Sequence, residues 1–140
     1  MIILDTNVVS ELMRAAPAPG VLSWLAQHRA SDVYTTAITV AEIRNGIARL
    51  PGGRRRDGLQ QAADEIFAAF PDQVLSFDLR AAAAYADLVA QRESTGSPIS
   101  GFDAQIAAIC RTHLATLATR NIADFNGTEV VTVNPWQGSE

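Results

Sequence analysis

Short apolar runs alternate with longer amphipathic stretches along this 140-residue chain, and that alternation constrains the fold more than any other feature. Runs rich in Ile, Leu, Val and Thr predict strands, and apolar residues recurring at helical spacing predict helices. Strands are predicted at residues 2–4, 33–36, 74–77, 114–119 and 130–133. Helices are predicted at residues 8–14, 21–28, 38–50, 55–70, 79–93 and 102–113, with a helical turn at 121–125. Such alternation is typical of a parallel α/β sheet with helices on both faces.

The composition is that of a globular chain, because 48% of the residues are apolar and 19% are charged. The length predicts a single domain over residues 1–140. No run approaches the roughly 18 consecutive apolar residues of a membrane span, so no membrane association is expected. The N-terminus has no basic segment and Asp5 interrupts its apolar run, which argues against a secretory signal and favours a cytoplasmic location.

The basic residues narrow the chemistry, because all eleven are arginine. A chain without lysine is not a Walker-type nucleotide-binding protein, a Schiff-base enzyme or a Ser–Lys hydrolase. It also differs from the phosphoaspartate enzymes that use a lysine beside the aspartate. Cys110, the sole cysteine, lies in an apolar run and is expected to be buried and inert. His28 and His113 lie too far apart for zinc-ligand spacing, so no zinc site is predicted.

Four acidic residues come just after a predicted strand or near the start of a predicted helix. They are Asp5, Glu42, Asp103 and Asp124, with Glu42 expected in the first turn of its helix. Parallel α/β sheets place their sites at the carboxyl ends of the strands, where these acids would meet. Carboxylates that meet repel one another, and a bound Mg²⁺ or Mn²⁺ would relieve that repulsion. Such a metal would also activate a water and neutralise charge on a scissile phosphate.

Helix capping is the alternative explanation for three of these acids, because each lies three residues after a residue that can cap a helix. The pairs are Thr39 with Glu42, Ser100 with Asp103, and Asn121 with Asp124. Asp5 does not fit this pattern, since it precedes its helix and Thr6 or Asn7 is expected to be the cap. For the other three acids, capping and metal binding both remain open.

The ordered motifs LDTN, AE, SGFDAQIAA, LATRNIADF and VNPW resemble the PIN-domain ribonucleases. The likeness is greatest to the VapC toxins of VapBC toxin–antitoxin modules, in the FitB-like subgroup, and runs nearly from end to end. DTN after a strand and the AE dipeptide are weak indicators alone. DAQIAA followed by LATRNIADF is considerably more specific, and the ordered combination is strong.

The resemblance implies a three-layer α/β/α sandwich around a central parallel sheet of about five strands, with an acidic pocket. It also implies a Mg²⁺- or Mn²⁺-dependent endoribonuclease that cleaves structured RNA, such as tRNA or ribosomal RNA. The acid positions of the family fall on Asp5, Glu42, Asp103 and Asp124. Supporting polar positions fall on Thr6, Asn7 and Thr119, although capping would also explain the first two. Phe102 departs from the pattern, because a smaller residue is expected before the acid, and it could narrow the pocket.

Candidate RNA contacts are arginines, because the net charge of −4 leaves no attractive global field for a nucleic acid. The stretch RNGIARLPGGRRR carries five of them, namely Arg44, Arg49, Arg54, Arg55 and Arg56. Arg49 lies seven residues after Glu42 and so on roughly the same helix face. Arg120 directly follows the predicted strand 114–119 and is the sixth candidate. A solvated loop and helix start is the alternative for the triple arginine.

The resemblance further implies a VapB-like antitoxin partner, whose C-terminal segment lies in a groove of the N-terminal helices and sends a basic residue toward the acids. Homodimers and hetero-oligomers with the antitoxin are also implied. Trp24 and Leu25 provide apolar surface for such a groove, and burial of Trp24 in the core is the alternative. Two other functions stay open: a PIN nuclease of RNA processing or DNA nicking that is not a toxin, and an antitoxin-binding regulatory module without catalysis.

Overall fold

The structure, a computed structural model, describes residues 1–137 and contains a five-stranded sheet. The strands are β1 (Ile2–Leu4), β2 (Val33–Thr36), β3 (Val74–Leu75), β4 (Thr116–Ala118) and β5 (Thr132–Val133). All neighbouring strands pair in parallel, in the order β3-β2-β1-β4-β5. The predicted parallel sheet is confirmed. β3, β4 and β5 are each shorter than predicted, and β3 and β5 lie at the two edges of the sheet.

The predicted helices are all present, with bounds shifted by one or two residues at several ends. They are α1 (Thr6–Leu12), α2 (Pro19–Ala26), α3 (Ala37–Ala48), α4 (Arg54–Ala68), α5 (Leu79–Ser94) and α6 (Gly101–His113). Two short 3₁₀ helices, η1 (Ala30–Asp32) and η2 (Ile122–Phe125), complete the described elements. Polar side chains just before the helix decide several starts, because their oxygens accept otherwise unpaired backbone N–H groups. Asp5, Thr36, Asp78 and Ser100 act in this way.

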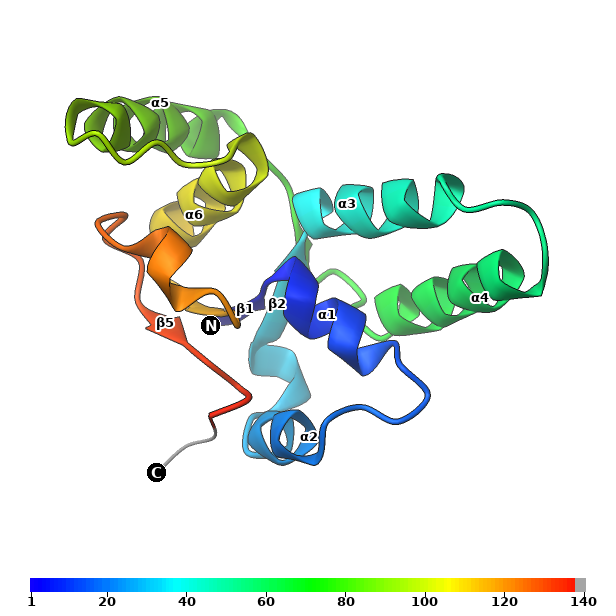
Figure 1. Cartoon of the computed structure of the whole chain (residues 1–140). Helices are drawn as coiled ribbons and strands as arrows, with labels where there is room; N and C mark the ends of the chain where they lie inside the picture. Colours follow the sequence, from blue (N-terminus) through cyan, green and yellow to red (C-terminus); the bar gives the residue numbers. More distant parts are fainter. Residues whose placement is uncertain (138–140) are drawn as a thin grey trace.

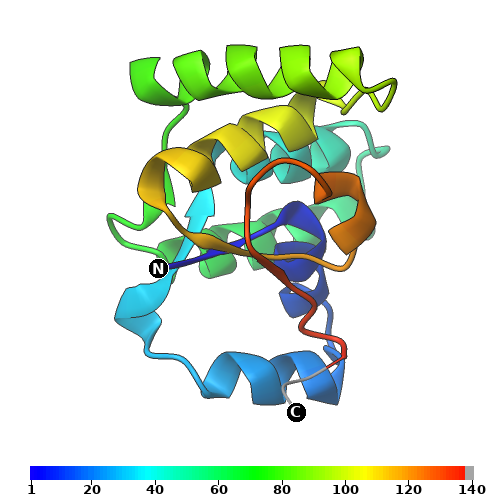
Figure 2. The same cartoon turned by 90° about the vertical axis from the view of Figure 1, so that its left-hand side faces the viewer.

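Successive residues of the central strands are buried on opposite faces of the sheet, which produces three layers. Ile3 of β1 and Leu117 of β4 pack in one core with α5 and α6. Their neighbours Leu4 and Ala118 pack in a second core with α1, α2, α3 and α4. Figures 1 and 2 show the helices on either side of the sheet. The predicted α/β/α sandwich is confirmed, since burial on both faces is what a parallel sheet requires.

The order of the strands creates a switch point between β1 and β4, where the chain changes its direction of travel across the sheet. The two strands stay paired up to their carboxyl ends, because Asp5 N–H donates to the Ala118 carbonyl at 2.9 Å. The helices α5 and α6 run antiparallel, so the start of α6 comes to the same edge of the molecule as η2 (Figure 2). Segments far apart in sequence therefore meet at this edge.

The expected burial of Cys110 and the core alternative for Trp24 are confirmed. Cys110 is buried, and burial raises the pKa of its thiol far above the usual value, so it is unreactive. Trp24 is 3% exposed and belongs to the core. His28 is half-buried and His113 exposed. Within residues 1–137, no helix combines the length and apolarity needed to cross a membrane.

Candidate active site

Asp5 is almost fully buried at the switch point, with 4% of its surface exposed. Its Oδ1 accepts from the Thr6 N–H and its Oδ2 from the Thr119 hydroxyl, each at 2.8 Å. Burial raises the pKa of Asp5 to about 6; the negative charges of Asp103 and Glu42 also raise it, and the two hydrogen bonds lower it. A carboxyl group with this pKa stands between its two protonation states near neutral pH, as groups at functional sites often do.

The expectation that Asp5 would not cap α1 is wrong. The backbone of Asp5 is extended, with φ −70° and ψ 163°, and its side chain is the N-cap. Thr6 and Asn7 are helical residues whose side chains bond elsewhere, so they do not cap the helix. Capping uses only one carboxylate oxygen of Asp5. The second oxygen accepts from the hydroxyl of Thr119, the residue after β4, and a helix cap does not need this second bond.

Glu42 lies in the second turn of α3, not in the first as predicted. The helix starts at Ala37 because the Thr36 hydroxyl, not that of Thr39, is the cap and accepts from the Thr39 N–H at 3.1 Å. The capping explanation for Glu42 is therefore wrong. Its Oε1 instead accepts from the Thr6 hydroxyl at 2.8 Å, across from α1. Burial is the main cause that raises the pKa of Glu42; the Thr6 hydrogen bond lowers it, and the charge of Asp103 raises it further.

Asp103 lies in the first turn of α6, as predicted. Its N–H donates to the Ser100 hydroxyl at 3.2 Å, so Ser100 is the cap. Burial raises the pKa of the half-buried Asp103 carboxyl, and the charge of Asp124 raises it further, whereas Ser100 and the Arg92 guanidinium lower it. An ionised carboxylate that is partly buried beside another carboxylate is disfavoured, and helix capping does not require that placement.

Asp124 lies on η2 with an exposed side chain. Its backbone N–H donates to the Asn121 carbonyl at 3.1 Å. The Asn121 side chain does not cap η2, so the predicted cap for this acid is wrong. Asp124 and Asp103 line the same cavity of about 210 Å³. Phe102 is 51% exposed and is not among the residues lining this cavity, so it does not narrow it.

The four acids therefore come from four elements and meet along one edge, in two pairs. Asp5 and Glu42 are both bonded to Thr6, and Asp103 and Asp124 share a cavity. Among residues 1–137, no three His, Cys, Asp or Glu side chains are close enough to form a ready metal cluster. The donor chemistry nonetheless fits Mg²⁺ or Mn²⁺, because these ions prefer carboxylate oxygens and keep several waters. Burial is the main cause of the raised pKa values of Asp5, Glu42 and Asp103, and the negative charge of a neighbouring acid adds to each.

The supporting polar residues form a hydrogen-bond network around Asp5. Asn7 Nδ2 donates to the Thr119 hydroxyl at 3.4 Å, and Asn7 Oδ1 accepts from the Arg120 N–H at 3.2 Å. The Thr119 oxygen also accepts from the Asn121 N–H at 3.1 Å. This network ties the start of α1 to the segment after β4 and holds the Asp5 carboxylate in one orientation.

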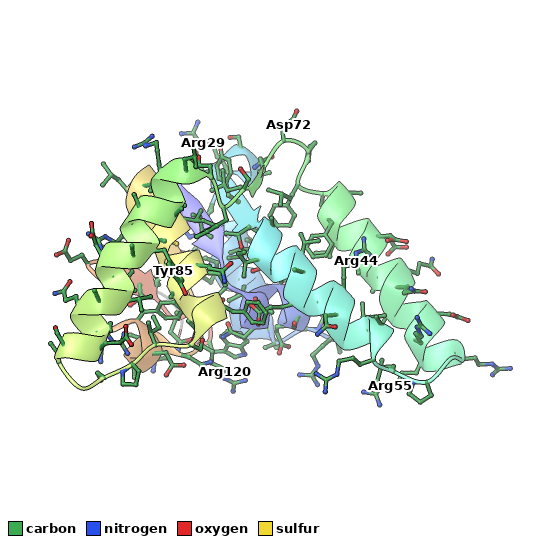
Figure 3. All side chains as sticks on the ribbon, turned by 90° about the horizontal axis from the view of Figure 1, so that it is seen from above. Arg29, Arg44, Arg55, Asp72, Tyr85 and Arg120 are labelled. Carbon is green, nitrogen blue, oxygen red and sulfur yellow. The ribbon has the colours of Figure 1, made fainter. Side chains whose placement is uncertain are left out.

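The candidate RNA-contacting arginines have different surroundings. Arg44 bonds Asp64 at 2.8 Å and lies over the Phe67 ring, so it joins α3 to α4 (Figure 3). Arg49 is exposed at the end of α3. The other helical candidates occupy the first turn of α4, where Arg54 and Arg55 are exposed and Arg56 is half-buried. Beyond these, Arg120 lies over the Trp136 ring, 4.8 Å from its centroid.

Two of these arginines flank the acids. Arg55 lines a groove of about 400 Å³ together with Thr6 and Glu42. Arg120 lies two residues after the end of β4, and its backbone N–H donates to the Asn7 side chain. Figure 3 shows Arg55 and Arg120 at one side of the molecule and Arg29 and Asp72 at the opposite side. That separation reflects chain direction, because Arg29 and Asp72 precede strands whereas Arg120 follows one.

Sequence reasoning missed two charged residues near this edge. Arg92, in the last turn of α5, donates to the Asp124 carbonyl at 3.0 Å. Glu11, 7% exposed, accepts from the Ala18 N–H at 2.9 Å and from Arg14, and the pKa of its carboxyl is lowered mainly by the first bond. A lone arginine before a Ser/Thr/Gly/Pro loop was the available signal for Arg92. No local signal indicated Glu11.

Known proteins resemble this chain over nearly its whole length. The PIN-domain family matches residues 2–128. The chain is 42% identical to VapC ribonuclease Y4jK of Sinorhizobium fredii over 138 residues, which is 98% of this chain and 99% of that protein. It is 39% identical to toxin FitB of Neisseria gonorrhoeae over 137 residues, with 97% and 99% coverage.

Comparison with solved structures gives the same result as the sequence comparison. A chain of the FitAcB crystal structure from Neisseria gonorrhoeae superposes with a TM-score of 0.89 and 39% identity, covering 97% of this chain and 99% of that chain. A chain of FitAB bound to a DNA fragment gives a TM-score of 0.91 and 38% identity, with 100% and 99% coverage. Both the sequence and the fold thus match the same group over the region that carries the four acids. The chain therefore belongs to the PIN-domain family, in the group of the VapC and FitB toxins.

Proposed function

We propose that this protein is a divalent-metal-dependent endoribonuclease toxin that cleaves structured RNA, such as tRNA or ribosomal RNA. The observation that carries the proposal is the pair of Asp5 and Glu42, joined through Thr6, at the same edge of the sheet as Asp103 and Asp124, which line one cavity. Burial, and to a lesser extent the neighbouring acids, raises the pKa of Asp5, Glu42 and Asp103, so their ionised forms are costly without a ligand that offsets the charge. The name of the relative VapC ribonuclease Y4jK supports the same activity.

The four acids are the proposed ligands of Mg²⁺ or Mn²⁺. When bound, the ion would lower the pKa of a coordinated water and offset charge on the scissile phosphate. Thr119 and the Thr6 N–H hold the Asp5 carboxylate, and the Thr6 hydroxyl holds Glu42. Asp124 is the exposed member of the set, so RNA would approach from its side of the site.

Arginines would hold the RNA backbone, because the guanidinium group matches phosphate geometry. Arg54, Arg55 and Arg56 occupy the first turn of α4, where the helix dipole disfavours positive charge. Three cations at that unfavourable position support a role in binding phosphate. Arg120 and Arg49 are additional candidates. Arg44 is the weakest, because its guanidinium is paired with Asp64.

A VapB-like antitoxin is the proposed partner, in hetero-oligomers built on a homodimer of this chain in the cytoplasm. Among the residues lining the groove beside Glu42 are the apolar Met13, which directly follows α1, Ile43 of α3 and Leu59 of α4. An apolar helix face with one basic residue fits such a groove. The solved FitAB and FitAcB complexes are the relatives that support this proposal.

Two other functions make different predictions. A PIN nuclease that is not a toxin would cleave RNA but would not arrest growth on expression. A regulatory module without catalysis would bind its antitoxin equally well after Asp5→Asn and would not cleave. The FitAB complex was solved bound to a DNA fragment, and this observation supports the regulatory alternative.

The first test compares RNA cleavage by the purified protein with that of Asp5→Asn, using total tRNA and ribosomal RNA with Mg²⁺, Mn²⁺ or EDTA. We expect discrete cleavage that needs metal and falls by at least about a hundredfold in the variant, as for loss of a group central to a site. Asp72→Asn is the matched control, because Asp72 lies at the opposite side, at φ 58°, a conformation that Asn tolerates. Equal cleavage by wild type and Asp5→Asn would contradict the proposal.

A further inference from the structure

Arg92 joins two segments that carry separate candidate acids. Its Nε donates to the Ser97 carbonyl at 2.6 Å, in the loop that leads from α5 into α6. Its Nη1 donates to the Asp124 and Asn126 carbonyls, each at 3.0 Å. One guanidinium thus binds three backbone oxygens, two of them more than 30 residues away in sequence.

The placement of Asp124 needs such a connection. η2 is a short 3₁₀ helix whose first residue has no side-chain cap. Phe125 anchors it in the core, and the Thr128 hydroxyl donates to the Phe125 carbonyl at 2.6 Å. Those contacts fix the buried side of η2. Arg92 alone among the described charged side chains bonds the carbonyl of Asp124 itself.

The same guanidinium lies beside Asp103. Arg92, Ser100, Asp103 and Asp124 line one cavity, and the positive charge of Arg92 favours the ionised form of Asp103. Asp103 is carried by α6 and Asp124 by η2, so their separation depends on how these two elements are held together. Arg92 reaches both, through the loop before α6 and through the η2 carbonyls.

We infer that Arg92 is a positioning residue that sets the relative placement of the Asp103 and Asp124 carboxylates, and with it the affinity of the site for a divalent cation. The inference rests on the proposed function for the presence of the cation. Outer residues that orient metal ligands typically change metal affinity by about 10- to 100-fold when they are removed. We expect that lysine does not replace Arg92, because Arg92 uses two separated nitrogens, Nε for the Ser97 carbonyl and Nη1 for the two η2 carbonyls, whereas the three donors of an ammonium are on one nitrogen.

The test measures binding of Mn²⁺ alone to wild type, Arg92→Ala and Arg92→Lys, by the electron paramagnetic resonance signal of free Mn²⁺. Arg80→Ala is the matched control, since Arg80 lies in the same helix and donates to a single carbonyl, that of Thr112, at 3.4 Å. We expect both Arg92 variants to bind Mn²⁺ about 10- to 100-fold more weakly than wild type, and Arg80→Ala to bind it normally.

Two further measurements separate positioning from a loss of folding. Added guanidinium ion, at a concentration below that which unfolds the protein, should restore Mn²⁺ binding to Arg92→Ala and leave Arg92→Lys unrescued. With RNA as substrate, kcat should fall while KM changes little. If Arg92→Ala does not fold, the Mn²⁺ affinity of Arg92→Lys is compared with that of wild type instead.

The outcomes distinguish this inference from the proposed function. If wild type and both Arg92 variants bind Mn²⁺ equally, the inference is overturned and the nuclease proposal stands. If wild type itself fails to bind Mn²⁺, the metal-dependent nuclease and the inference are both overturned. A lower melting temperature with unchanged Mn²⁺ affinity would make Arg92 a purely structural residue and would also overturn the inference.

Discussion

At the residue scale, the site is defined by carboxyl groups that the fold holds in costly surroundings. Asp5 has both oxygens bonded and is buried, yet its pKa is raised to about 6 because burial outweighs the two hydrogen bonds. Buried carboxylates of this kind are tolerated where function requires them. The negative charges of Asp103 and Glu42 add to the effect of burial on Asp5.

Metal-free protein should therefore lose stability as pH rises between about 4 and 6. The folded Asp5 has a pKa of about 6, above its ordinary value of 3.8, so the folded state binds a proton more tightly than the unfolded state does. The stabilisation is present below pH 4 and is lost as pH passes 6, by at most about 3 kcal/mol. Urea unfolding of wild type and Asp5→Asn between pH 4 and 8 checks this, and the variant should lose less stability. Parallel pH curves would contradict the prediction.

At the element scale, caps placed the helix starts and so the acids on them. Thr36, two residues before the start of the predicted helix 38–50, caps α3 early enough to place Glu42 in its second turn. Ser100 starts α6 three residues before Asp103. Successive residues of a helix are rotated by roughly 100° about its axis. The residue at which a helix begins therefore decides which of its side chains face the site.

Ser100→Ala should lower the free energy of unfolding by about 1 kcal/mol, because the Asp103 N–H loses its acceptor. Ser100→Asn should keep most of that stability, since asparagine is an equally good cap. Urea unfolding in EDTA measures both variants without any contribution from metal. Equal losses in the two variants would mean that the cap is not the cause.

At the scale of the whole molecule, the strand order brings together acids that are up to 119 positions apart, from Asp5 to Asp124. The β1–β4 pairing places Thr119 against Asp5, and the antiparallel α5–α6 pair returns Asp103 to the same edge. The site is thus a property of the completed sheet, and a ligand of the site should stabilise the whole fold.

Mg²⁺ or Mn²⁺ should raise the melting temperature, because a ligand that binds only the folded state stabilises it by mass action. At about 100 times its dissociation constant the ion would add about 2.7 kcal/mol. The shift should shrink below pH 6, where protons compete for Asp5, and should be absent in Asp5→Asn. Differential scanning fluorimetry with Asp72→Asn as control measures it. An equal shift in Asp5→Asn would place the ion elsewhere.

The sequence by itself determined the parallel α/β class, the positions of the helices and the four candidate acids, because these depend on local spacing and residue type. Resemblance to a family then supplied their expected common role. Tertiary structure alone decided that Asp5 caps its own helix, that Glu42 bonds Thr6 and that Arg92 holds η2. The Asp5 cap is a local contact with Thr6, but the second Asp5 oxygen, Glu42 and Arg92 bond to segments distant in sequence. Local propensity carries no information about such contacts, since they exist only once the sheet order has brought the segments together.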